Sequence, residues 1–200
     1  VLVNINPAYR THELEYALKQ SQTQSLILLN EFKSSKYFNM LKEVCPELDS
    51  CKPGELQAAK LPELKNVILF GDTHPGTFAF DALIEGGKDG SDEQLREIMA
   101  GLDPDDDINI QYTSGTTGFP KGVVLSHFNI LNNGWHVAQI MRFTDKDRLC
   151  IPVPFYHCFG MVLANLACVT SGATMVIPGP IFEPISVFEA VSQEKCTALH

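Results

Sequence analysis

Short apolar segments alternate with amphipathic segments along this 200-residue chain, and this alternation restricts the fold more than any other sequence feature. The segments that suit β-strands are residues 1–5, 25–29, 66–70, 108–112, 122–125, 149–153, 173–177 and 197–200. The segments that suit helices are residues 10–21, 34–44, 78–85, 91–99, 126–141, 159–170 and 185–194. Alternating strands and helices form sheets with parallel neighbours. The sequence therefore predicts an α/β fold with a largely buried, partly parallel sheet.

The charge balance argues against a nucleic-acid partner. The chain has 15 Lys and Arg against 24 Asp and Glu, a net charge of −9, and no basic stripe that could displace counterions from phosphates. No apolar run approaches the ~20 residues of a membrane span, and no signal peptide is visible, so no transmembrane segment is expected. The strand-like segments at both ends predict a piece of a longer protein, and any targeting segment would then lie outside it.

Metal-binding patterns are weak in this chain. Its six cysteines are Cys45, Cys51, Cys150, Cys158, Cys168 and Cys196, and no two of them have Cys-x-x-Cys spacing. We expect free, mostly buried thiols in a reducing compartment rather than a zinc site. The acidic run at residues 103–107 has two interpretations, a metal site or a solvated turn before a strand, and the turn is the more common use of such a run. No metal ligand is assigned.

The most informative segment is a loop rich in glycine and hydroxyl side chains between two strand-like segments. Its residues are Thr113, Ser114, Gly115, Thr116, Thr117, Gly118, Phe119, Pro120 and Lys121. The glycines allow backbone N–H groups to approach a ligand closely, and the hydroxyls and the lysine add donors and one positive charge. This combination predicts a polyphosphate site, against the alternative of a turn that binds nothing.

The loop differs from the phosphate loop of GTPases and kinase-like enzymes. That motif, started at Gly115, requires glycine at position 120 and a hydroxyl at position 122, where this chain has Pro120 and Gly122. The segment after Lys121 also has the pattern of a strand, so no helix N-terminus would point at the phosphates. If residues 113–121 bind a polyphosphate, they belong to a different class of phosphate loop from that of GTPases and kinase-like enzymes.

Residues 113–121 resemble the signature loop of the adenylate-forming (AMP-binding) superfamily, which includes acyl-CoA synthetases, luciferases and peptide-synthetase adenylation domains. Residues 3–9 (VNINPAY) resemble an early segment of the acyl-CoA synthetase branch. Residues 125–129 (LSHFN), 152–160 (PVPFYHCFG) and 171–173 (SGA) resemble further motifs of the superfamily. The resemblance covers nearly the whole chain and is greatest for the mitochondrial medium-chain ligases of that branch. It implies the large N-terminal domain of the adenylate-forming fold, with mixed and mostly parallel sheets flanked by helices.

The resemblance implies a two-step reaction. A carboxylate attacks the α-phosphate of ATP to give an acyl-adenylate and pyrophosphate, and the thiol of CoA then displaces AMP. The implied substrates are a fatty acid, ATP and CoA, with Mg²⁺ sharing the phosphate charge. Residues 113–121 would hold the β- and γ-phosphates, and Lys121 would act as a catalytic residue by stabilising charge.

The segment around Tyr156 and His157 separates branches of this superfamily. Amino-acid-activating members carry an aspartate near this point to pair with the substrate ammonium, and this chain has no acid there. The implied substrate is therefore a carboxylic acid without an α-amino group. His157 would lie at the floor or gate of the acyl pocket, the alternative being a structural histidine. Trp135, Phe143 and Phe159 are candidates for an acyl tunnel, although plain core packing is the commoner role of such residues.

The superfamily's later motifs and its small C-terminal domain are missing from residues 1–200. We therefore expect an incomplete N-terminal domain that is inactive alone. Two alternatives remain, namely an acyl-AMP ligase or luciferase-like member, and a truncated protein that binds ATP or acyl chains without turnover. The resemblance implies a mitochondrial location, with the cytoplasm as the alternative, and no sequence feature indicates an oligomeric state.

Overall fold

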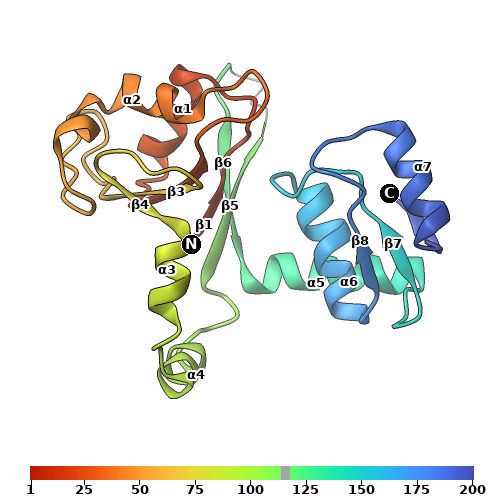
Figure 1. Ribbon diagram of the computed structural model, residues 1–200. Helices are drawn as coiled ribbons and strands as arrows, with labels where there is room; N and C mark the ends of the chain where they lie inside the picture. Colours follow the sequence, from red (N-terminus) through yellow and green to blue (C-terminus); the bar gives the residue numbers. More distant parts are fainter. Residues whose placement is uncertain (114–117) are drawn as a thin grey trace. The chain divides into compact units, whose positions relative to one another are not determined.

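The computed structural model describes residues 1–113 and 118–200, which form two compact units (Figure 1). The first unit contains residues 1–6, 103–113 and 123–200, and the second contains residues 7–102 and 118–122. Each unit combines strands and helices. The strand pairs β1–β5, β2–β3, β3–β4, β7–β8 and β7–β9 are all parallel, which confirms the predicted α/β class.

The second unit is built on one three-stranded sheet in the order β2-β3-β4. Its elements are α1 (Thr11–Gln20), β2 (Ser25–Leu29), α2 (Tyr37–Val44), a 3-10 helix (Pro46–Ser50), β3 (Asn66–Phe70), β4 (Thr77–Ala79), α3 (Phe80–Gly87) and α4 (Asp92–Ala100). The core gathers leucines from α1, α2, the 3-10 helix and β3, among them Leu18, Leu41, Leu48 and Leu69. Burial of these side chains holds α1 and α2 on the sheet.

The first unit contains two three-stranded sheets, in the orders β1-β5-β6 and β8-β7-β9. Its strands are β1 (Leu2–Asn4), β5 (Asp107–Thr113), β6 (Lys121–Ser126), β7 (Arg148–Cys150), β8 (Thr174–Val176) and β9 (Ala198–Leu199). Its helices are α5 (His127–Met141), a π-helix (Phe159–Leu166), α6 (Ala167–Ser171) and α7 (Pro184–Gln193). Leu149, Ile151, Ala164 and Cys168 form its buried core.

Three predicted helices differ from the observed elements. The helix expected over residues 34–44 begins only at Tyr37, and Ser35 instead forms an isolated antiparallel bridge with Phe32. The helix expected over residues 78–85 starts only at Phe80, because Thr77–Ala79 pairs with β3 as strand β4. The helix expected over residues 159–170 is a π-helix as far as Leu166 and an α-helix only from Ala167. The pairing that makes residues 77–79 a strand is tertiary, and local apolar periodicity does not encode it.

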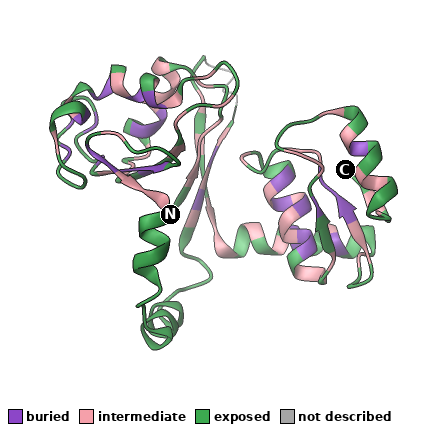
Figure 2. Cartoon of the chain, in the orientation of Figure 1, coloured by how far each residue is buried: buried purple, intermediate pink, exposed green. Residues whose placement is uncertain are grey.

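The expectation of a largely buried sheet is wrong for several strand residues (Figure 2). In β2, Leu26 is 9% exposed whereas its neighbour Ile27 is 53% exposed. Val124 of β6 is 50% exposed. Successive strand residues point to opposite faces, which accounts for the contrast between Leu26 and Ile27. In β6 the consecutive residues Val123 and Val124 are both exposed, Val123 at 41%. Within residues 1–113 and 118–200, no helix is both long and apolar enough to cross a bilayer.

All six cysteines are free thiols, as expected. Cys45, Cys150 and Cys168 are buried, Cys51 and Cys196 are half-buried, and Cys158 is exposed. Burial raises the pKa of the Cys45 thiol to about 12, and the nearby carboxylates of Glu47 and Glu15 add to this shift. Burial also raises the pKa of Cys150 and Cys168.

Candidate active site

Strand β5 leads into the predicted phosphate loop. It pairs in parallel with β1, in a register that sets Leu2 beside Asn109 and Asn4 beside Gln111. Thr113, predicted as a loop residue, is the exposed last residue of β5. The predicted ligand residues Ser114, Gly115, Thr116 and Thr117 lie outside the described residues. Because Thr113 ends β5 and β5 pairs with β1, the first residue of the predicted loop belongs to a strand of the sheet.

The far end of the loop is described from Gly118 onward. Gly118 has a φ of 96°, in the left-handed region that favours glycine. Pro120 is half-buried, and Lys121, predicted as the end of the loop, is the exposed first residue of β6. A strand, not a helix, follows the lysine, as the sequence predicted. Lys121 thus extends from a strand that lies beside β5 in the sheet β1-β5-β6.

Phe119 attaches this end of the loop to helix α1. Its ring lies 5.2 Å from the ring of Tyr16 and 6.0 Å from that of His12, measured between centroids. His12 and Tyr16 are four residues apart, so both project from the same face of α1. The loop therefore has an aromatic anchor, which the sequence pattern did not single out.

The start of α1 is itself held in place by a local contact. The backbone N–H of Arg10 donates a hydrogen bond of 3.0 Å to Oε2 of Glu13, one half of a capping box. The backbone N–H groups of Glu13 and Arg10 lower the pKa of the Glu13 carboxyl. This cap fixes the first turn of α1, from which His12 contacts Phe119.

His157 lies in the turn that precedes the π-helix. Its Nδ1 accepts a hydrogen bond of 3.1 Å from the backbone N–H of Phe159, and its carbonyl oxygen accepts one of 3.0 Å from the backbone N–H of Met161. An accepting Nδ1 requires the proton of the neutral ring to be on Nε2. The imidazole is exposed, not packed in the core. His157 is therefore oriented by backbone contacts and remains accessible to a ligand.

The three aromatic candidates for an acyl tunnel have different surroundings. Phe143 packs against the core of Leu149 and Ile151, as the packing alternative predicts. Trp135 of α5 is 45% exposed, and Phe159 of the π-helix is 36% exposed. The ring of Phe159 meets that of His200 edge to face at 5.0 Å. Phe159 lies two residues after His157, so it is the candidate with the clearest relation to the predicted acyl site.

The acidic run at residues 103–107 forms a hydrogen-bonded turn. The backbone N–H of Asp103 donates to Oδ2 of Asp106 and that of Asp105 donates to Oδ1 of Asp103, both at 2.9 Å. The carbonyl oxygens of Pro104 and Asp106 accept hydrogen bonds from the first backbone N–H groups of α5. Among the residues that the structure describes, no three His, Cys, Asp or Glu side chains form a metal-binding group. The turn thus supports the start of α5, which confirms the interpretation as a solvated turn.

A buried polar cluster beside the loop was not predicted from the sequence. Asn109 and Gln111 of β5 are 1% and 7% exposed, and Nε2 of Gln111 donates a hydrogen bond of 2.9 Å to Oδ1 of Asn109. Nδ2 of Asn109 donates to the carbonyl oxygen of Leu2 at 3.0 Å. The signal was present in the sequence, because Asn109 and Gln111 alternate with Ile108 and Ile110, and two amides on one buried strand face are unusual.

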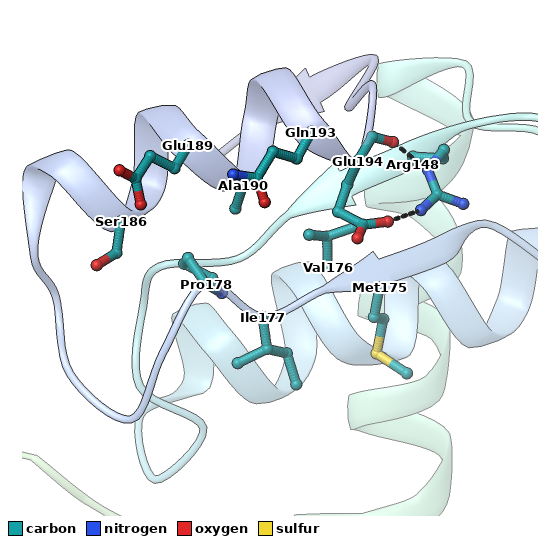
Figure 3. Close-up of a pocket in the computed structure, with 10 residues that line it drawn as sticks. All are labelled: Arg148, Met175, Val176, Ile177, Pro178, Ser186, Glu189, Ala190, Gln193 and Glu194. Atoms are coloured by element: carbon teal, nitrogen blue, oxygen red, sulfur yellow. Dashed lines mark hydrogen bonds and ion pairs between the residues drawn. The ribbon is translucent and has the colours of Figure 1, made fainter.

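A separate pocket of about 430 Å³ lies between β7, β8 and α7 (Figure 3). Arg148 Nη2 forms an ion pair of 2.6 Å with Oε2 of Glu194 at one end of it, and Arg148 Nε donates to the carbonyl oxygen of Glu194. Ser186, Glu189 and Gln193 also line it. The predicted site residues contribute none of this lining.

The comparison with protein families decides the family. The sequence pattern described as AMP-binding enzyme matches residues 1–200. The chain belongs to the AMP-binding enzyme family. The expected resemblance to adenylate-forming enzymes is thereby confirmed.

Individual members of the AMP-binding family agree with this assignment. Over its full length the chain is 47% identical to YngI of Bacillus subtilis strain 168, which carries the provisional name of an acyl-CoA synthetase and of which it covers 36%. It is 40% identical over 205 residues to the human mitochondrial medium-chain acyl-CoA ligase ACSF2, of which it covers 33%. The chain thus spans about a third of the length of these curated relatives.

Solved structures agree on the fold. MbtA of Mycobacterium smegmatis, in its apo form, superimposes with a TM-score of 0.75 at 21% identity, over 98% of this chain and 33% of MbtA. At this identity the match supports the fold alone. The predicted fold class, part of the adenylate-forming architecture with sheets flanked by helices, is confirmed.

Proposed function

We propose that this chain is the N-terminal part of an acyl-CoA ligase that activates a carboxylate with ATP. The observation that carries the proposal is the loop of residues 113–121, which joins two strands of one sheet in a chain 47% identical to YngI and 40% identical to the human ligase. The family membership gives the class of enzyme. The loop chemistry and the surroundings of His157 give the proposed roles.

The reaction has two displacement steps. In the first, a carboxylate oxygen attacks the α-phosphorus of ATP, the bond from that phosphorus to the bridging oxygen breaks, and pyrophosphate leaves. In the second, the sulfur of CoA attacks the acyl carbon, the bond from that carbon to the phosphate oxygen breaks, AMP leaves with that oxygen, and the thiol proton passes to solvent. The protein's part in the first step is positioning and stabilisation of charge on the leaving pyrophosphate.

Lys121 and the loop hydroxyls would bind the β- and γ-phosphates. Lys121 carries a compact positive charge at the start of β6, and Thr113 presents a hydroxyl at the end of β5. Mg²⁺ would arrive with ATP and neutralise part of its charge.

His157 and its neighbours would receive the carboxylic acid. Residues 152–160 contain no Asp or Glu, and the exposed Phe155 and Phe159 flank the histidine in sequence. An ammonium group bound there would find no counter-charge in this segment, whereas an alkyl chain would find aromatic surface. We propose a fatty acid as substrate, of medium chain length as in the name of the human relative.

The chain is proposed to be an incomplete AMP-binding domain. It spans about a third of its relatives, and the remaining two thirds would supply the other nucleotide contacts. We therefore propose that the 200-residue chain does not turn over alone. The human relative is mitochondrial by name and the more similar YngI is bacterial, so we propose the mitochondrial matrix only for a eukaryotic source, and the cytoplasm otherwise.

The test is carboxylate-dependent exchange of pyrophosphate into ATP by the full-length protein. Acids of increasing chain length are compared, and exchange that peaks at medium chains supports the proposal. Lys121→Ala should lower the exchange rate about 100-fold, whereas Lys146→Ala, at an exposed lysine of the turn before β7, should not. Exchange without CoA-dependent thioester formation would instead favour an acyl-AMP ligase. A protein that binds ATP but exchanges with no acid would contradict the proposal.

A further inference from the structure

The buried amide cluster of β5 reaches Met161 of the π-helix, which follows the turn of His157. Nδ2 of Asn4 lies 3.3 Å from the sulfur of Met161, and Nε2 of Gln111 lies 3.6 Å from the same sulfur. Asn4 and Gln111 are register partners on the paired strands β1 and β5. Two amide donors from two strands therefore converge on one thioether acceptor of the π-helix.

The contact between Gln111 and Met161 joins two parts of the candidate site. Gln111 lies two residues before Thr113, where β5 passes into the predicted phosphate loop. The backbone N–H of Met161 donates to the carbonyl oxygen of His157 at 3.0 Å, so Met161 is one hydrogen bond from the turn that presents the imidazole. The cluster thus joins the strand that leads to the loop with the turn that holds His157.

Burial of the Asn109 and Gln111 amides has a free-energy cost that apolar side chains would not have. A buried amide without a partner costs free energy, and apolar side chains would fill the same volume without that cost. Gln111 uses its donors on Asn109 and Met161, and Asn109 in turn holds the carbonyl oxygen of Leu2. Directional contacts of this kind specify register, which apolar packing does only weakly.

We infer that Gln111 and Met161 are positioning residues that hold the strand of the phosphate loop in register with the turn of His157. This inference rests on the proposed function, because the proposed function assigns the loop after β5 to the nucleotide and the turn of His157 to the carboxylate. Attack on the α-phosphorus requires both reactants to be held at a defined separation. A loosened contact would leave each reactant bound but misaligned.

The test uses three variants of the full-length enzyme in the pyrophosphate-exchange assay. Met161→Leu removes the acceptor at nearly constant volume, and Met161→Gln replaces it with a carbonyl acceptor on a side chain of similar length. Met175→Leu is the matched control, since Met175 is 41% exposed on β8. We expect about a tenfold lower kcat for Met161→Leu with both KM values within about twofold of wild type, partial recovery in Met161→Gln, and no change in Met175→Leu.

Whether Met161→Leu or Met161→Gln has the higher kcat distinguishes a positioning role of Met161 from a packing role. If Met161 only fills space, leucine should preserve activity at least as well as glutamine, and that result would overturn the inference. Equal kcat for wild type and Met161→Leu would overturn it as well, while leaving the proposed function intact. A wild-type protein without carboxylate-dependent exchange would overturn the proposed function and the inference with it.

Discussion

A methyl group on the Cα atom of Gly160 would lie 2.4 Å from the carbonyl oxygen of Pro154 and 3.0 Å from the ring of Phe155. Gly160 is buried in the first turn of the π-helix, so the turn that bears His157 folds directly back onto this backbone. The glycine that ends the segment at residues 152–160 is therefore required by close approach. It allows the turn to close, and the closed turn orients the imidazole.

The first prediction follows from this approach. Gly160→Ala should lower the free energy of unfolding by about 1–3 kcal/mol, because the backbone of the turn must shift to accept the added methyl group. Denaturation by urea, followed by circular dichroism on the full-length protein, gives the value. Gly86→Ala is the control, since a methyl group on Gly86 of α3 would meet nothing within 4 Å and alanine favours helices. Equal midpoints for wild type and Gly160→Ala would contradict the prediction.

The aromatic anchor of the loop leads to the second prediction. Phe119→Ala removes the ring that contacts Tyr16 at 5.2 Å, and aromatic pairs contribute about 0.5–1.5 kcal/mol beyond burial. We expect the KM for ATP to rise about two- to tenfold while the KM for the carboxylic acid stays constant. Phe188→Ala, at a ring 71% exposed on α7, should change neither constant. An unchanged KM for ATP in Phe119→Ala would show that the anchor does not affect nucleotide binding.

The cysteines should differ widely in reactivity, which is the third prediction. Only the thiolate reacts with iodoacetamide, and Cys45 is buried with a pKa raised to about 12, whereas Cys158 is exposed. Brief alkylation at mildly alkaline pH should modify Cys158 first and leave Cys45, Cys150 and Cys168 unmodified in peptide mass spectra. The same treatment in urea should modify all six cysteines. Early modification of Cys45 in the folded protein would contradict the burial described for it.

The fourth prediction concerns stability at low pH. The backbone N–H of Thr144 and the hydroxyls of Thr197 and Thr144 donate to the carboxylate of Asp147 and lower its pKa below the ordinary 3.8. A carboxyl whose pKa is lower in the folded state than in the unfolded state stabilises the fold when the pH is above the unfolded-state pKa. This contribution disappears as the pH falls through the folded-state pKa. Asp147→Asn should therefore be less stable than wild type at about pH 7, and the difference should shrink below about pH 4.

Urea denaturation at about pH 7 and about pH 3 measures this difference. Asp145→Asn, in the same turn and with an exposed side chain, is the control. Its free energy of unfolding should equal that of wild type at both pH values. A difference between Asp147→Asn and wild type that is as large in acid as at neutral pH would mean that the carboxylate charge is not its source.

Much of this protein could be predicted from local sequence. The apolar runs at residues 25–29 and 66–70 coincide with β2 and β3, and the helix expected over residues 126–141 is α5, which begins at His127 with Ser126 as its N-cap. The loop of residues 113–121 was placed between two strands, and they are β5 and β6. These features are local because glycines, hydroxyls and apolar runs limit the backbone over only a few residues.

Tertiary structure decided the features that depend on distant partners. Residues 77–79 form β4 because β3 offers an edge to pair with, and Gln111 and Met161, 50 residues apart, meet only when β5 and the π-helix pack together. Phe143 packs against the core while Phe159 is 36% exposed, although both are apolar aromatic residues. Sequence by itself determined the family, the strand–loop–strand arrangement and the glycine- and hydroxyl-rich composition of the loop. Only the folded chain decided which side chains orient the site, because that depends on contacts between residues that periodicity and motif spacing cannot bring together.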